Sequence, residues 1–173
     1  RQWIFADDFL FHNRVHSDKL LFWGRIPAVL LAVVLGFFVF KLSKKLYGNG
    51  AGYLALFLYV LCPNVLANSQ LVTTDLAAAA FIFFGVYSFL AFMENPSMKN
   101  LLITGTLTGL ALSAKFTTVI IFPIFICIFL LFLPPKKNKK PSGYFAKFLV
   151  MAAVTLFTLA LTYQFTGFGT YFN

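Results

Sequence analysis

The stretch Asn68-Ser-Gln-Leu-Val-Thr-Thr-Asp75 separates two long apolar runs, residues 51–67 and 76–93. Roughly 20 apolar residues in a helix cross the ~30 Å hydrocarbon core of a bilayer, and runs slightly shorter than this also suffice. The polar stretch therefore predicts a turn between two membrane spans. Asp75 is the only acid in residues 51–93. A carboxylate so close to lipid is costly and marks a candidate functional residue.

Composition extends this interpretation to the whole chain. Of its 173 residues, 60% are hydrophobic and only 11% are charged, unlike a soluble domain. The sequence predicts an all-α, polytopic transmembrane helical bundle of about six spans. These are residues 22–40, 51–67, 76–93, 101–114, 116–133 and 148–165.

The predicted domain organisation is simple. We expect residues 1–21 to form an outer-face loop with an interfacial amphipathic segment. Residues 22–173 then form a single transmembrane helical domain, truncated at both ends.

Lysines are distributed unequally between the predicted loops. Nine lie in alternate loops, namely Lys41, Lys44, Lys45, Lys99, Lys136, Lys137, Lys139, Lys140 and Lys147. The opposite loops after the first span hold only Lys115. Because cytoplasmic loops are enriched in Lys and Arg, this pattern predicts that Asp75 and Lys115 face outward.

The formal net charge of +9 follows from the same asymmetry and suits anionic membrane lipids. A nucleic-acid partner is not needed to explain it. We expect a multi-pass protein of the bacterial inner (plasma) membrane, with its functional site facing outward.

The outer polar residues could support chemistry or merely structure. Cations there could bind a phosphate, and acids could activate a hydroxyl or hold a metal ion. Each has a structural alternative. Thr74 or Asp75 could cap the start of the third span, and Lys115 could extend its ammonium group to the lipid headgroups. Arg25 could mark the interface where a helix begins.

Four segments of the chain resemble a known family. They are Arg25-Ile-Pro27, Lys44-Lys-Leu-Tyr-Gly48, Leu61-Cys-Pro-Asn-Val-Leu-Ala-Asn-Ser-Gln-Leu-Val-Thr-Thr-Asp75 and Gly109-Leu-Ala-Leu-Ser-Ala-Lys-Phe-Thr117. In order and spacing they are similar to membrane glycosyltransferases of the GT-C type, in particular glycosyltransferase family 39. That family contains the protein O-mannosyltransferases and aminoarabinose transferases. The resemblance covers nearly all of residues 1–135.

The resemblance implies a GT-C-like enzyme that takes a sugar from a polyprenyl-phosphate donor, such as dolichyl-phosphate-mannose, on the outer face. A protein, a lipid or a glycan would accept it. Asp75 matches a secondary catalytic acid, Lys115 lies near the lipid phosphate, and Arg25 borders the active-site cavity. Three residues of the polar stretch are assigned to substrate binding: Asn68, Gln70 and Thr74.

The main catalytic acid of such enzymes lies in the first outer loop, which would place it upstream of Arg1. We therefore expect the chain to be a fragment that lacks an N-terminal span and cannot catalyse transfer alone. No cofactor is identified, although a divalent metal ion could bind at Asp75.

A multi-span transporter or permease is the alternative, with Asp75 as its coupling site. Transporters place such acids near the bilayer midplane, in broken helices and often within inverted repeats. Asp75 lies at the outer end of a predicted span, and the sequence shows no repeat. A non-catalytic membrane scaffold would leave the outer polar residues without a role.

Overall fold

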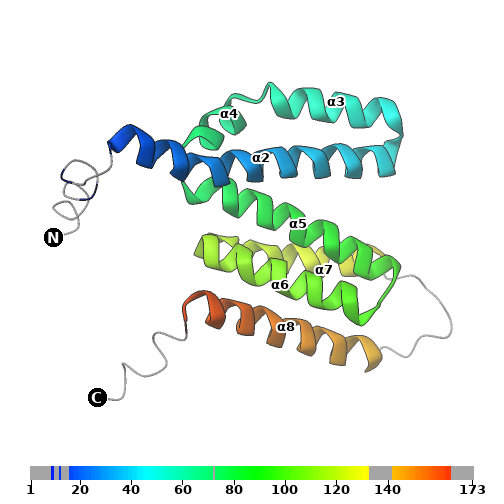
Figure 1. The fold of residues 1–173 in the computed structure, drawn as a ribbon. Coiled ribbons are helices and arrows are strands. Elements are labelled where there is room, and N and C mark those ends of the chain that lie inside the picture. Colours follow the sequence, from blue (N-terminus) through cyan, green and yellow to red (C-terminus); the bar gives the residue numbers. More distant parts are fainter. Residues whose placement is uncertain (1–8, 10–11, 13–15, 72, 133–141, 165–173) are drawn as a thin grey trace, which may run out of the picture. The chain divides into compact units, whose positions relative to one another are not determined.

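The computed structural model describes residues 9, 12, 16–71, 73–132 and 142–164, and in these it contains helices and no strand. The predicted all-α fold is therefore confirmed (Figure 1). The elements are α2 (Ser17–Tyr47), α3 (Asn49–Val60), α4 (Pro63–Gln70), α5 (Thr74–Glu94), α6 (Met98–Ala114), the 3-10 helix η1 (Phe116–Ile120), α7 (Ile121–Phe132) and α8 (Ser142–Thr162).

A helical segment lies over each of the six predicted spans. By length and composition, α2 and α5 can cross a membrane, and α3 and α4 form a third candidate if the bent pair is one span. Residues 116–131 and 146–162 form shorter apolar helices. The membrane bundle is thus supported, while the count of six crossings stays a prediction.

The chain divides into two compact units, residues 1–76 and residues 77–173. In the first unit α2 and α3 lie side by side in opposite directions (Figure 1). Gly48 reverses the chain with a φ of 91°, in a region that only glycine adopts readily. Glycines also bring the helices together, since a Cβ at Gly36 would lie 2.8 Å from Cε1 of Tyr59.

The helix pair α3 and α4 is bent by 57° at Leu61 and Cys62. Pro63 is the first residue of α4, a position where its missing N–H costs nothing. The predicted span 51–67 is therefore broken into two helices. It gives the polar residues of α4 their own short helix, separate from the apolar α3.

The second unit has a core of aromatic and aliphatic side chains from α5, α6, α7 and α8. Phe89 of α5 stacks on Phe125 of α7 with a centroid distance of 4.3 Å. The buried cluster consists of Phe89, Phe92, Leu101, Ile121, Phe125 and Met151. These large side chains join the four helices into one unit.

Glycines of α6 allow α8 to approach closely. A Cβ at Gly105 would lie 2.9 Å from Val154, and one at Gly109 would lie 2.6 Å from Cβ of Thr158. The hydroxyl of Thr155 donates to the carbonyl of Gly105 at 3.1 Å. The GxxxG pattern of α6 is thus a helix-packing surface, as such patterns often are in membranes. Gly105 meets Val154, and Gly109, four residues later, meets Thr158, also four residues later. The helices α6 and α8 therefore run parallel.

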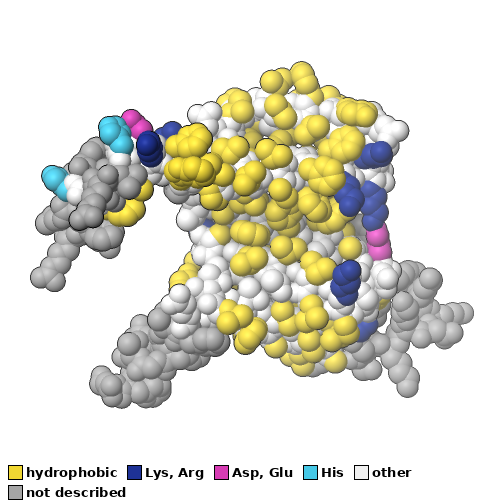
Figure 2. All heavy atoms as spheres, in the orientation of Figure 1, with side chains coloured by type: hydrophobic (Ala, Val, Ile, Leu, Met, Phe, Trp, Pro, Cys, Tyr) yellow, Lys and Arg dark blue, Asp and Glu magenta, His cyan; other side chains and the backbone are white. Residues whose placement is uncertain are grey.

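The surface of both units is apolar along the helices and cationic near helix ends (Figure 2). In the first unit, Lys41, Lys44 and Lys45 occupy the C-terminal end of α2. In the second, Nζ of Lys147 donates to the carbonyl of Pro96 at 2.7 Å. This distribution suits helices that lie in lipid with their lysines at the headgroups.

Candidate functional site

The polar stretch that connects α4 to α5 is held by hydrogen bonds within the first unit. The Asn68 side-chain amide donates to the carbonyl of Asn64 at 2.9 Å. Oδ1 of Asn68 accepts a hydrogen bond from the Thr73 hydroxyl at 3.4 Å, a long distance for this kind of bond. The end of α4 is therefore linked, weakly, to the residue that precedes α5.

Asp75 is the second residue of α5, and its side chain is exposed. The helix begins at Thr74, so Thr73 rather than Thr74 or Asp75 occupies the position just before it. A carboxylate in the first turn is stabilised by the positive end of the helix dipole. Asp75 is thus an ionisable group at an accessible helix end, suited either to helix stabilisation or to contact with a ligand.

The other predicted residues of the stretch differ in accessibility. Gln70, the last residue of α4, and Thr74 are exposed. Asn68 is half-buried, and its two hydrogen bonds use one amide hydrogen and one lone pair of Oδ1. One hydrogen and one lone pair remain. All three residues therefore keep polar atoms that could bind a substrate.

Lys115 occupies the break between α6 and η1. Its backbone is extended, with φ of −159° and ψ of 130°, and its side chain is exposed. The N–H of Lys115 donates to the carbonyl of Ala111 at 3.2 Å. Its carbonyl accepts from the N–H of Thr118 at 3.0 Å and from the Thr118 hydroxyl at 2.7 Å. The backbone from which the ammonium group projects is fixed on both sides.

Arg25 lies on the exposed surface of α2 in the first unit. Because α2 begins at Ser17, Arg25 is well inside the helix and does not mark its start. Pro27, two residues later, cannot donate to the carbonyl of Trp23 one turn earlier. Arg25 therefore lies where the backbone of α2 offers an acceptor that lacks its usual partner within the helix.

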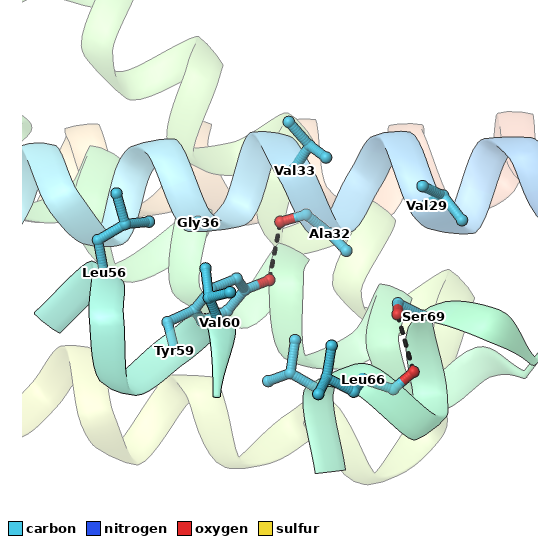
Figure 3. A pocket seen from close by; sticks show the side chains of 10 residues that line it. Val29, Ala32, Val33, Gly36, Leu56, Tyr59, Val60, Leu66 and Ser69 are labelled. Atoms are coloured by element: carbon cyan, nitrogen blue, oxygen red, sulfur yellow. Dashed lines mark hydrogen bonds between the residues drawn. The ribbon is translucent and has the colours of Figure 1, made fainter. Parts of the chain in front are cut away.

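An apolar groove of about 270 Å³ lies between α2, α3 and α4 (Figure 3). Its walls include Val29 and Val33 of α2, Val60 of α3 and Leu66 of α4. Ser69 supplies a hydroxyl at one end, which already donates to the carbonyl of Leu66 at 2.9 Å. Such a groove suits a hydrocarbon chain and offers little to the hydroxyls of a sugar.

The structure joins Asn68 to Thr73 and places both beside the start of α5. Asp75 belongs to the first unit and Lys115 to the second, so their closeness stays a prediction. Thr118 was not among the predicted site residues, although its bond to Lys115 is one of the shortest side-chain hydrogen bonds described. The spacing Lys115-x-x-Thr118 is the sequence signal that could have identified it.

The proposed metal ion finds no preformed site in the described part of the chain, which holds no group of three or more His, Cys, Asp and Glu side chains. Asp75 by itself supplies a single carboxylate, and divalent cations take more ligands than that. A divalent metal ion at Asp75 therefore stays a prediction.

The chain matches a model of a known protein family. A family model described as dolichyl-phosphate-mannose-protein mannosyltransferase matches residues 14–161. No curated protein and no solved structure matches the chain. The matched range contains Arg25, the polar stretch with Asp75, and Lys115 with Thr118.

Proposed function

The chain belongs to the dolichyl-phosphate-mannose-protein mannosyltransferase family of GT-C type membrane glycosyltransferases, and from this premise we propose its reaction. A mannosyl-like residue passes from a polyprenyl-phosphate-linked donor to a hydroxyl of a protein, lipid or glycan. The transfer takes place on the outer face of the membrane. The family membership also argues against the transporter alternative.

The position of Asp75 is the observation that carries the proposal. Its carboxylate is exposed in the first turn of α5 and follows a polar stretch that retains hydrogen-bonding atoms at Asn68, Gln70 and Thr74. An acid at a helix end can meet a substrate at the membrane surface, where donor headgroup and acceptor both reside. A coupling acid of a transporter would instead be expected near the bilayer midplane.

Within the second unit, contacts between α5 and α6 fix the relative direction of these two helices. The Asn100 side chain near the start of α6 donates to the carbonyl of Ala91 near the end of α5, at 3.3 Å. Further along, a Cβ at Gly85 would lie 3.7 Å from the hydroxyl of Thr108. Within this unit the two helices therefore run antiparallel, as consecutive membrane spans do.

The reaction needs three contributions. The acceptor oxygen attacks the anomeric carbon, its proton passes to a carboxylate base, and the bond from that carbon to the phosphate oxygen breaks. The phosphate leaves with the bonding electrons as polyprenyl phosphate. Lys115 stabilises its negative charge. Asp75 orients the acceptor or the sugar, while the base is a separate carboxylate.

The lysine distribution supports the orientation. The C-terminal end of α2 carries Lys41, Lys44 and Lys45, and the opposite loops carry Lys115. Under the positive-inside rule the α4–α5 connection then faces outward. The bacterial inner membrane remains the proposed location, and the groove of α2–α4 offers a hydrocarbon-compatible surface there.

Transfer of labelled mannose from dolichyl-phosphate-mannose, measured with the full-length protein in membranes, tests this proposal. Asp75→Asn keeps the size of the side chain and removes its charge, so we expect transfer to fall about 100-fold, as for a misplaced substrate. Asp18→Asn is the matched control, because Asp18 is also an exposed first-turn carboxylate, in α2. Full activity of Asp75→Asn would rule out the proposed role of Asp75.

A further inference from the structure

The backbone of Lys115 is hydrogen-bonded to two buried residues. Its N–H bonds to Ala111, which is 0% exposed, and its carbonyl bonds to Thr118, which is 1% exposed. The residues between Lys115 and Thr118 point outward, since Phe116 is 84% exposed and Thr117 is exposed as well. The buried hydroxyl of Thr118 therefore anchors an otherwise exposed segment.

This anchor matters because a lysine side chain is long and flexible. When a flexible group binds a ligand, the loss of its conformational freedom weakens binding. A backbone that is already fixed leaves only the side chain to be ordered. The two hydrogen bonds from Thr118, at 3.0 Å and 2.7 Å, hold the carbonyl of Lys115 in one orientation.

We propose that Thr118 is a positioning residue for donor binding: its hydroxyl fixes the backbone of Lys115 so that the ammonium group meets the phosphate of the lipid-linked donor. The inference rests on the proposed function, in which Lys115 stabilises that phosphate. Thr118 itself touches neither donor nor acceptor.

Thr118→Val tests this assignment, because it replaces the hydroxyl by a methyl group of similar size. The Lys115 carbonyl keeps its bond to the backbone N–H of residue 118, so no buried acceptor is left without a partner. We expect kcat/KM for dolichyl-phosphate-mannose in the full-length protein to fall about two- to tenfold, the range that one net hydrogen bond allows. Thr118→Ser keeps the hydroxyl and should retain most of the activity.

Thr108→Val is the matched control. Thr108 is also buried at 1% exposure, and its hydroxyl donates to the carbonyl of Thr104 at 2.8 Å, but it contacts no part of Lys115 in these bonds. Its loss should leave kcat/KM for the donor unchanged. An equal loss in Thr108→Val and Thr118→Val would mean that both act through helix stability, and would overturn the proposal.

A double-mutant cycle with Lys115→Ala distinguishes failure of the positioning role of Thr118 from failure of the proposed function. If Thr118 acts through Lys115, Thr118→Val should have no further effect once Lys115 is alanine. A loss that persists in the Lys115→Ala background overturns the positioning role. Full activity of Lys115→Ala alone would instead contradict the proposed function. Should Thr118→Val fail to fold, Thr118→Ala against Thr118→Ser compares the same hydroxyl.

Discussion

Asp75 and Lys115 lie at two breaks between helices, and the hydrogen bonds at these two breaks differ. Before Asp75, the chain passes through a polar stretch in which the Thr73 hydroxyl donates to Oδ1 of Asn68 over a long 3.4 Å. At Lys115, the break is short and the buried Thr118 holds the backbone with a 2.7 Å bond. A carboxylate at a helix start is stabilised by the helix dipole, whereas the backbone of Lys115 is held by hydrogen bonds to Ala111 and Thr118.

We infer that the two breaks have different roles in the reaction. A polar, accessible stretch offers hydrogen bonds to an acceptor, while a cation on a fixed backbone suits a phosphate that is the same in every turnover. Variants that affect one break and not the other test this distinction.

The largest effect is expected from Lys115→Ala. Removing one group that stabilises a developing oxyanion typically costs about 10²- to 10³-fold in rate, and we expect transfer from dolichyl-phosphate-mannose to fall by this amount. Lys115→Arg should retain part of the activity because it keeps the positive charge. Lys99→Ala is the control, as Lys99 is an exposed lysine near the opposite end of α6. If the Lys115→Ala enzyme keeps transfer activity within tenfold of the wild type, the proposed role of the Lys115 ammonium group is wrong.

A smaller effect, on stability, is expected from Gly109→Ala. The new Cβ would lie 2.6 Å from Cβ of Thr158 and 2.8 Å from the carbonyl oxygen of Thr155, so α6 and α8 must separate. Overpacking of this kind costs about 1–3 kcal/mol, which thermal unfolding in detergent should reveal as a lower Tm. Because α6 ends at the Lys115 break, the donor KM should rise as well.

Gly50→Ala provides the comparison for this variant. A Cβ at Gly50 would meet no atom within 4 Å. Since alanine favours a helix over glycine, Gly50→Ala should leave the Tm unchanged or raise it slightly. A similar loss of stability in both variants would show that the α6–α8 contact is not the cause.

The sequence predicted much of the fold because helix length and charge determine where spans begin and end. A helical segment lies over each of the six predicted spans. The early start of α2 at Ser17 was not predicted, since polar residues such as Ser17 and Asp18 can extend a helix beyond the membrane without an apolar signal.

The burial of Thr118 also escaped prediction, for a physical reason. A helix that is apolar on all sides shows no preferred face, so its sequence does not indicate which residues pack inward. Thr117 and Thr118 are alike in the sequence, yet the first is exposed and the second is buried. Only the tertiary packing of the second unit distinguishes them.

The smallest effects are expected at Asn68 and Thr73, and they test the role of the polar stretch between α4 and α5. Thr73→Val removes a single long hydrogen bond, so we expect it to change transfer by no more than about twofold. Asn68→Ala removes the same bond, the bond to Asn64 and the amide atoms that remain available for a substrate. If Asn68 binds substrate, the KM of the Asn68→Ala variant for donor or acceptor should rise about five- to tenfold, clearly more than that of Thr73→Val. Equal effects would make Asn68 only a structural link between α4 and α5, and would leave Gln70 and Thr74 as the remaining neighbours of Asp75 in substrate binding.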